Sequence, residues 1–368
     1  MTKVRHLLGI SGGKDSAALA IYMRNLYPEL DIEYYTCDTG KELEETYQLI
    51  KNLEVYLGKT IELLQAANQS TQDPFDHYLD LYGGFLPSAN SRWCTKKLKL
   101  EPFEKFVGND PVISYVGIRG DEDREGYISK KPNIQSIFPF RKNIWSEDVI
   151  GKALTNNNLV KLIEQFDGLS YTPSKVRFRE LLLKPISFNF TQTQKTNILL
   201  DVDVRLFNEL IFSFLKQTSY PLSEENTFPL VDNEDVLIRE DIFKLLEESG
   251  VGVPAYYNKL DFDLNGKVGQ YSRSRSGCYF CFYQQKIEWI WLYEQHPDRF
   301  LKAVAYEKDG YTWNDNERLE DLIKPARMQA IKEEYLKRTA RIAHKSKSPY
   351  LLDILNEAEG EGCASCFI

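Results

Sequence analysis

A glycine-rich turn near the start of the chain, Ile10–Ser16, constrains the fold more than any other stretch. The apolar run Leu7–Ile10 before it is typical of a buried strand, and Ala17–Met23 after it is typical of a helix. A strand, a glycine turn and a helix start bring backbone N–H groups together at the positive end of a helix dipole. Two glycines alone would indicate only a tight turn, but Gly12 and Gly13 are flanked here by Ser, Lys and Asp side chains. The stretch therefore predicts a phosphate-binding site at the first strand-to-helix turn.

Strand-like and helix-like segments alternate along residues 1 to 118. The expected strands are Arg5–Ile10, Ile32–Cys37, Thr60–Leu64 and Val112–Gly117. Helices are expected near Ser16–Leu26 and Glu42–Leu57. This alternation predicts an α/β fold with a doubly wound, mostly parallel sheet, in which ligands bind beyond the carboxyl ends of the strands.

Charged side chains follow two of these strands at their carboxyl ends. Asp38 follows the second strand, where a carboxylate can hold Mg²⁺ or a ribose hydroxyl, or can simply belong to a helix N-terminal turn. Arg119 and Arg124 follow the fourth strand, and a guanidinium fork suits the oxygens of phosphate or sulfate. Neighbouring acids can pair with these arginines instead, but their position at the crevice favours binding.

Length and composition exclude several classes of protein. A chain of 368 residues predicts one large or two moderate domains. The net charge of −8 argues against a uniformly basic nucleic-acid-binding surface, although it allows a local basic groove. Without a long apolar run or room for a signal peptide before the first strand, we expect no membrane span and a cytoplasmic location. In that compartment six cysteines favour metal or redox chemistry over disulfides.

Four regions are expected along the chain. Residues 1–140 form a nucleotide-binding α/β domain, and 141–228 form an inserted or family-specific subdomain without readable chemistry. Residues 229–345 form a helical C-terminal region that contains a cysteine pair, and 346–368 form a tail with a second Cys-x-x-Cys.

Five stretches, taken in order, resemble the phosphoadenosine phosphosulfate reductase-like family of the adenine nucleotide alpha hydrolase (HUP) superfamily. They are Ser11–Ser16, Asp38–Gly40 with Glu45 and Thr46, Arg92–Thr95 with Lys97, Gly117–Arg119 with Glu122 and Arg124, and Arg275–Cys281. Glu44 stands where the family usually has a proline. The resemblance covers residues 1 to 140 and roughly 229 to 340. The segment after Cys281 is similar to the DndC and SspD type of protein that accompanies bacterial DNA phosphorothioation.

The resemblance implies an ATP pyrophosphatase with a place in phage defence. Such an enzyme cleaves ATP to AMP and pyrophosphate while it activates a DNA backbone phosphate oxygen for replacement by sulfur. The implied catalytic residues are Lys14, Asp15, Asp38 and Arg119. The residues implied to bind ATP and Mg²⁺ are Ser11, Gly12, Gly13, Lys14, Asp15, Ser16, Asp38, Gly40, Gly117, Arg119 and Arg124. Lys96 and Lys97 join the two arginines as candidates for holding the acceptor phosphate.

The cysteines are expected to handle the sulfur. Cys278 and Cys281 have the spacing that lets two thiolates meet one metal, and the family pattern adds Cys94 at the same crevice. The resemblance thus implies a [4Fe–4S] cluster with three protein ligands, and Cys366 is the candidate for an uncertain fourth ligand. A zinc ion held by both Cys-x-x-Cys pairs is the alternative. Cys37, at the end of a strand, is expected in the core.

Partners and competing functions also follow from the resemblance. The implied partners are the DNA backbone, a cysteine desulfurase as sulfur donor, and further phosphorothioation proteins. The competing activity is a phosphoadenosine phosphosulfate (sulfo-nucleotide) reductase, although the Glu-Cys-Gly-Leu-His end of assimilatory reductases is absent from this sequence. Two more functions compete with these: an RNA or tRNA thiolation enzyme, and a non-catalytic nucleotide-binding partner.

Overall fold

The computed structural model describes residues 3–122, 129, 131–170, 172–308, 310–314 and 317–345. Arg124, Cys366 and the expected tail at 346–368 lie outside the described residues. The domain boundaries at 140, 228 and 345 stay predictions.

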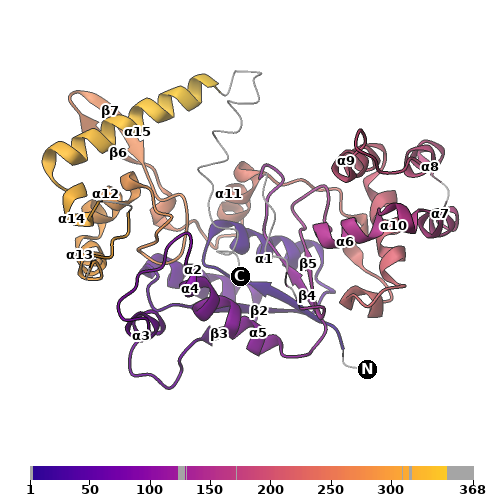
Figure 1. The fold of residues 1–368 in the computed structure, drawn as a ribbon, viewed down its shortest axis with the longest axis horizontal. Coiled ribbons are helices and arrows are strands. Elements are labelled where there is room, and N and C mark those ends of the chain that lie inside the picture. The colour runs from indigo at the N-terminus through magenta and orange to yellow at the C-terminus, as the bar shows by residue number, and fades with distance from the viewer. Residues whose placement is uncertain are drawn as a thin grey trace.

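A five-stranded parallel sheet forms the centre of the molecule (Figure 1). Its spatial order is β3-β2-β1-β4-β5. The strands are β1 (Arg5–Gly9), β2 (Ile32–Asp38), β3 (Ile61–Gln65), β4 (Val112–Tyr115) and β5 (Ile134–Ile137). This arrangement confirms the expected doubly wound α/β fold, and the four expected strands lie within two residues of their expected bounds.

The fifth strand is absent from the sequence-based expectation. β5 reads Ile-Gln-Ser-Ile, so only two of its four residues are apolar, yet all four are buried. Gln135 is buried because neighbouring structure covers it, and its side-chain oxygen accepts a hydrogen bond from the backbone N–H of Leu222 at 3.1 Å. A partner 87 residues away along the chain leaves no local signal in the strand itself.

Helices cover both faces of the sheet, and the strand residues alternate between them. Leu8, Tyr34 and Ile113 pack in the cluster that contains α1 (Lys14–Leu26) and α2 (Glu44–Leu57). Leu7, Tyr35 and Val112 pack on the other face with α5 (Glu101–Val107), and Cys37 lies buried there as expected. Successive strand side chains point to opposite faces, so neither face of β1 is left to solvent. Two shorter helices on this part of the chain are α3 (Pro74–Leu81) and α4 (Trp93–Thr95), the latter followed by a π-helical turn at Lys96–Leu100.

A group of helices lies beside the β5 edge of the sheet, on the right in Figure 1. It contains α6 (Glu147–Ala153), α7 (Leu159–Asp167), α8 (Lys175–Leu182), α9 (Gln192–Val202) and α10 (Val204–Leu215), while α11 (Arg239–Glu248) packs on α1. Phe166, Phe178 and Phe207 are fully buried in the same hydrophobic cluster as the sheet residue Ile113. The helical region at 141–228 therefore shares one continuous core with the sheet.

The C-terminal region lies on the opposite side, on the left in Figure 1. It contains the antiparallel hairpin β6 (Leu260–Leu264) and β7 (Lys267–Tyr271), then α12 (Lys286–Gln295), α13 (Pro297–Ala305), α14 (Leu319–Leu322) and α15 (Pro325–Lys345). Trp289 and Trp291 are buried in a second cluster that also takes in Phe75 and Trp93 from the sheet domain. No helix in the described ranges has the length and apolarity that a membrane span requires.

We expect core packing in the helical region to contribute strongly to stability. Phe166 is fully buried and stacks on Phe178 with ring centroids 5.1 Å apart, whereas Phe188 is 97% exposed. Phe166→Ala should lower the free energy of unfolding by about 3–5 kcal/mol, because it removes buried apolar area and leaves a cavity. The matched variant Phe188→Ala should change it by less than about 0.5 kcal/mol. Urea unfolding followed by circular dichroism measures both, and equal losses would contradict the shared core.

Candidate functional site

The glycine-rich turn connects β1 to α1 and is shaped by close packing. Gly12 has a φ of +72°, a left-handed conformation that glycine adopts without strain. A Cβ atom on Gly12 would lie 2.2 Å from the Cγ2 of Thr46 on α2, so a side chain does not fit there. Within the turn, the hydroxyls of Ser11 and Ser16 lie 3.0 Å apart. The predicted phosphate loop is therefore held tightly against the following helices.

Three charged side chains meet beneath this turn, and all three are almost fully buried. The Lys14 ammonium lies 3.0 Å from one carboxylate oxygen of Asp15, and the Arg119 guanidinium lies 2.9 Å from the other. Arg119 also pairs with Asp121 at 2.8 Å and with Glu122 at 2.7 Å. Burial by itself raises the pKa of Asp15, but the charges of Lys14 and Arg119 hold it below the usual value.

This ion network changes the expected role of Asp15. Both of its carboxylate oxygens are engaged by cations, so in this structure it serves as the counter-charge for Lys14 and Arg119. Gly117 allows the network to form, because a Cβ there would lie 2.9 Å from the backbone oxygen of Asp15. Asp38, whose oxygens accept hydrogen bonds from neutral donors, stays the expected Mg²⁺ contact.

Asp38 lies at the carboxyl end of β2, as expected. Its Oδ1 accepts hydrogen bonds from the N–H of Gly40 at 2.8 Å and from the hydroxyl of Tyr47 at 2.9 Å. Its Oδ2 accepts from the side-chain amide of Gln65 at 2.9 Å. Burial by itself raises the pKa of Asp38, but these hydrogen bonds hold the pKa below its usual value. A carboxylate that stays ionised and lies at a crevice can bind a divalent cation.

Glu42 is a site residue that the sequence interpretation missed. It is buried next to Asp38 and accepts hydrogen bonds from the hydroxyl of Thr39 at 2.7 Å and the N–H of Lys41 at 3.1 Å. Burial, with the charge of Asp38 in addition, raises the pKa of Glu42 to about 7. Nothing in the local sequence distinguishes this glutamate from the acidic first turn of α2 that follows it.

A cavity of about 180 Å³ opens beside these carboxylates, between the ends of β1 and β2. Ser11, Asp38 and Glu42 line it, together with Tyr47 from α2 and Lys99 from the π-helical turn. Both predicted loops thus face one crevice, as a doubly wound sheet requires.

Two adjacent tyrosines from the C-terminal half support the glycine-rich turn, and neither was identified from the sequence. The hydroxyl of Tyr256 donates a hydrogen bond to the carbonyl of Gly12 at 3.0 Å. The hydroxyl of Tyr257 accepts from the N–H of Lys14 at 3.4 Å, and the ring of Tyr257 lies 5.3 Å from the Lys14 ammonium. These contacts span more than 240 residues of chain, which is why no local motif indicates them.

The cysteine-containing loop lies directly on the nucleotide loops. A Cβ on Gly13 would lie 2.5 Å from the hydroxyl of Ser276, so the two segments touch. The Sγ of Cys278 lies 3.2 Å from the hydroxyl of Thr39, and Cys278 forms an isolated β-bridge with Glu42. The structure therefore brings together the predicted phosphate loop, the Asp38 loop and one cysteine of the predicted pair.

Cys94 and Cys278 pack against the same hydrophobic cluster of the C-terminal region. Burial raises the pKa of Cys94 to about 12 and that of Cys278 well above its usual value, and Cys281 adds to both increases. Across the described residues, however, no group of three or more His, Cys, Asp or Glu side chains is arranged to hold a metal ion. The described thiols form no ready-made cluster or zinc site in this structure, and the expected ligand set stays a prediction.

The expected acceptor-phosphate lysines lie near Cys94. Lys97 pairs with Glu101 at 2.7 Å, one helical turn further on, and Lys96 is exposed. Arg92 lies over the ring of Tyr283 at 5.2 Å, which connects this segment to the cysteine loop. The positions of these side chains leave their predicted role untested.

The pKa of Glu42 predicts a pH-dependent stability. Because the pKa rises from 4.5 in the unfolded chain to about 7 in the folded one, the folded state binds the proton more tightly. The protonated Glu42 side chain contributes its full stabilisation below pH 4.5, and this stabilisation is lost as the pH rises through 7. Relative to Glu42→Gln, the wild type should lose on the order of 3 kcal/mol of unfolding free energy across this window.

Urea unfolding between about pH 4.5 and pH 8 measures this difference. Glu62→Gln, at an exposed position of β3, is the matched control for loss of a carboxylate. A constant difference between the wild type and Glu42→Gln at every pH would show that the Glu42 pKa is not raised.

Comparison with known proteins finds a family match over the part of the chain that contains the glycine-rich turn, Asp38 and Arg119. Residues 5–144 match the family model of the phosphoadenosine phosphosulfate reductase domain. Uncharacterized protein MJ0066 of Methanocaldococcus jannaschii is 32% identical over 154 residues, which cover 38% of this chain and 30% of that protein. Uncharacterized protein MJ0973 of the same organism is 24% identical over 188 residues, which cover 48% of this chain and 43% of that protein.

A phage protein shows a similar partial match. The uncharacterized nin region protein ORF290 of Escherichia phage lambda is 25% identical over 158 residues, which cover 36% of this chain and 53% of that protein. The chain thus spans about a third to a half of the length of these relatives, and no solved structure matches it. The family match associates residues 5–144 with nucleotide-related sulfur chemistry and with an enzyme of the phosphoadenosine phosphosulfate reductase-like kind.

Proposed function

We propose that this protein is an ATP pyrophosphatase that activates a DNA backbone phosphate oxygen for replacement by sulfur. The observation that carries the proposal is the contact between the cysteine loop and the nucleotide loops. Ser276 lies against Gly13, and the Sγ of Cys278 lies 3.2 Å from the hydroxyl of Thr39. A nucleotide bound at the glycine-rich turn would therefore lie beside the thiols that handle sulfur.

The first step begins when a nonbridging oxygen of the acceptor phosphate attacks the α-phosphorus of ATP. The bond from that phosphorus to the oxygen bridging the β-phosphate breaks, and pyrophosphate leaves with the negative charge. Lys14 and the N-terminal N–H groups of α1 would receive this charge, which is electrostatic stabilisation with little covalent work by the protein. Mg²⁺ held at Asp38 supplies further positive charge when it is bound.

In the second step a sulfur nucleophile attacks the adenylated phosphorus, and AMP leaves with the displaced oxygen. A cysteine desulfurase would supply the sulfur, which would arrive as a persulfide on Cys94, Cys278 or Cys281. A neighbouring thiol then releases the phosphorothioate by forming a disulfide with the first cysteine, and an external thiol reductant restores both. Cys94 and Cys278 pack against the same hydrophobic cluster, which supports this step because two thiols must come together.

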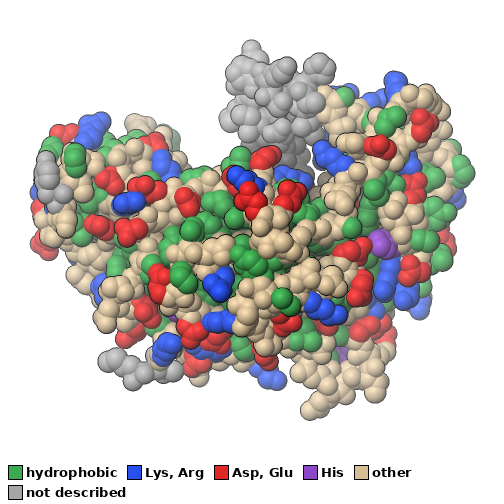
Figure 2. Space-filling view, turned by 180° about the vertical axis from the view of Figure 1, so that it is seen from behind, with side chains coloured by type: hydrophobic (Ala, Val, Ile, Leu, Met, Phe, Trp, Pro, Cys, Tyr) green, Lys and Arg blue, Asp and Glu red, His purple; other side chains and the backbone are tan. Residues whose placement is uncertain are grey.

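The surface charge bears on how DNA would be held. On the face drawn in Figure 2, the basic and acidic side chains of the described residues are interspersed, and the net charge of the chain is −8. Such a surface gives little general attraction for a polyanion. DNA binding would therefore depend on a local groove and on partner phosphorothioation proteins.

Lys14 provides the direct test of the proposed activity. Lys14→Ala should slow pyrophosphate release from ATP by at least about 100-fold, because it removes a preorganised cation from the leaving group. Lys51→Ala, an exposed lysine on α2, is the matched control and should retain the wild-type rate. The assay measures pyrophosphate with and without DNA, cysteine and a desulfurase.

Different outcomes of this assay would identify the competing functions. Sulfite production from the sulfo-nucleotide with a thiol donor, without ATP cleavage, would show a reductase, which the same family match also allows. Turnover stimulated by tRNA and not by DNA would show an RNA thiolation enzyme. Tight ATP binding without turnover under every condition would show a nucleotide-binding partner protein.

The [4Fe–4S] cluster stays a prediction with its own measurement, and it excludes the persulfide step on the same thiols, because a thiolate that ligates iron cannot form a disulfide. Burial keeps the thiols of Cys94 and Cys278 protonated, because it raises the pKa of each, so a metal would have to displace their protons and draw the side chains together. After anaerobic purification we expect about four iron and four sulfide per chain, reduced strongly in Cys278→Ser. Cys37→Ser, which changes a cysteine in a different hydrophobic cluster from that of Cys94 and Cys278, is the control. Stoichiometric zinc without iron would overturn the cluster in favour of a zinc site.

A further inference from the structure

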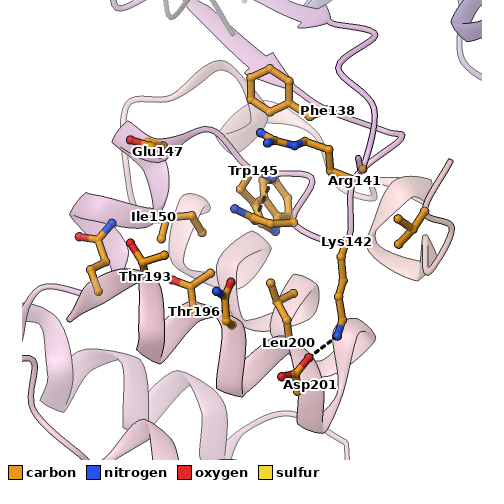
Figure 3. Close-up of a pocket in the computed structure, with 15 residues that line it drawn as sticks. Phe138, Arg141, Lys142, Trp145, Glu147, Ile150, Thr193, Thr196, Leu200 and Asp201 are labelled. Atoms are coloured by element: carbon orange, nitrogen blue, oxygen red, sulfur yellow. Dashed lines mark hydrogen bonds and ion pairs between the residues drawn. The ribbon is translucent and has the colours of Figure 1, made fainter. Parts of the chain in front are cut away.

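A second and larger cavity lies between the sheet and the helices of the 141–228 region (Figure 3). Its volume is about 530 Å³, within the range of roughly 300–1,000 Å³ typical of small-ligand sites. The lining comes from Gly120 in the loop after β4, the segment after β5, helices α6 and α9, and the loop that holds Val236 before α11. Of the described residues that are expected to bind ATP, none lines it.

The floor of the cavity is apolar and its walls are polar. Trp145, Ile150 and Leu200 form the floor, and all three are buried. On one wall α9 presents Thr193 and Thr196, as Figure 3 shows, and its neighbouring residue Asn197 also lines the cavity. A lining that combines apolar side chains with hydroxyl and amide groups suits a heterocycle that carries donors and acceptors on its edge.

Two cations stand on the opposite side of the cavity in Figure 3, Arg141 and Lys142. Lys142 reaches Asp201 at 2.5 Å, so its ammonium is held at the edge of the cavity. The Lys142–Asp201 pair has no net charge and Glu147 also lines the cavity, so Arg141 is the cation that fits the phosphate of a ligand that joins a heterocycle to a phosphate. A nucleotide unit has this composition.

Thr196 supplies a separate indication of a ligand site. The side chain is 5% exposed, and its Oγ1 has no hydrogen-bond partner among the described residues. A buried hydroxyl without a partner costs free energy, so such groups are rare unless a ligand or water completes them. This hydroxyl belongs to a residue that lines the cavity.

The cavity is connected to the nucleotide loops by direct contacts. Arg141 donates a hydrogen bond to the backbone carbonyl of Glu122 at 2.8 Å, and the carboxylate of Glu122 pairs with Arg119 at 2.7 Å. Arg119 in turn pairs with Asp15 at 2.9 Å beneath the glycine-rich turn. Gly120, the residue after Arg119, itself lines the cavity. The Arg119–Glu122 segment is therefore a wall shared by the two sites.

We propose that this cavity binds one nucleotide unit of the acceptor DNA strand. This proposal rests on the proposed function. The base lies on Trp145 and Leu200, its edge meets Thr196 and Asn197, and its phosphate faces Arg141. The strand then continues along the Arg119–Glu122 segment toward the glycine-rich turn, where the adjoining phosphate meets ATP.

Fluorescence anisotropy of a short, labelled single-stranded DNA measures its affinity for the protein and so tests the proposal. Thr196→Val keeps the side-chain shape, and Asn197→Leu changes an exposed residue, so both variants should fold. Each should weaken DNA binding by roughly tenfold, the loss expected when one contact to a base edge is removed. Thr339→Val on α15 and Asn189→Leu in an exposed loop are the matched controls and should bind as the wild type does.

Photo-crosslinking gives a second, independent measurement. Single-stranded DNA that carries 5-iododeoxyuridine should crosslink to the peptide that contains Trp145, and the crosslink should weaken in Thr196→Val. Unchanged affinity in both cavity variants, or crosslinks confined to other peptides, would overturn the proposal. If free mononucleotide or RNA at equal concentration displaces the DNA, the cavity still binds a nucleotide unit, and the displacing molecule is its ligand.

The outcomes separate this proposal from the proposed function. If the wild type releases no pyrophosphate but the cavity variants still lose DNA affinity, the ATP pyrophosphatase assignment is wrong and the cavity assignment holds. If pyrophosphate release depends on Lys14 but DNA affinity is the same in every cavity variant, the cavity assignment is wrong and the activity stands.

Discussion

The buried ion network of Lys14, Asp15 and Arg119 holds the candidate site together. Charges in a protein interior are costly unless they are paired, so these three side chains must stay together when the chain folds. Asp15 and Arg119 are 104 residues apart, and their contact joins the first strand-to-helix turn to the loop after β4. The same contact places the Lys14 and Arg119 side chains, both paired with carboxylates, beneath the glycine-rich turn.

The C-terminal half of the chain completes this site and does not merely flank it. Tyr256 bonds to the backbone of Gly12, and Cys278 meets Thr39 at the Asp38 loop. A hydrophobic cluster that includes Trp289 also contains Phe75 and Trp93 from the sheet domain. The glycine-rich turn and the cysteine loop are thus parts of one packed body, as the proposed transfer of sulfur would require.

The helical region at 141–228 is joined to the same network from the other side. Its core is continuous with that of the sheet, and Arg141 reaches the backbone of Glu122 next to Arg119. The larger cavity therefore adjoins the ion network without containing it. The sequence of this region indicated no chemistry, and its importance follows from its contacts with the sheet and with the Arg119–Glu122 segment.

Local sequence signals were sufficient to predict the α/β fold, its first four strands, the glycine-rich turn and the place of Asp38, because apolar runs and turn glycines act over a few residues. Three features became visible only in the folded chain: Asp15 is the counter-charge of Arg119, Glu42 is buried with a pKa of about 7, and β5 completes the sheet. Each of these depends on burial and charge pairing between residues far apart in the chain, which no local pattern records.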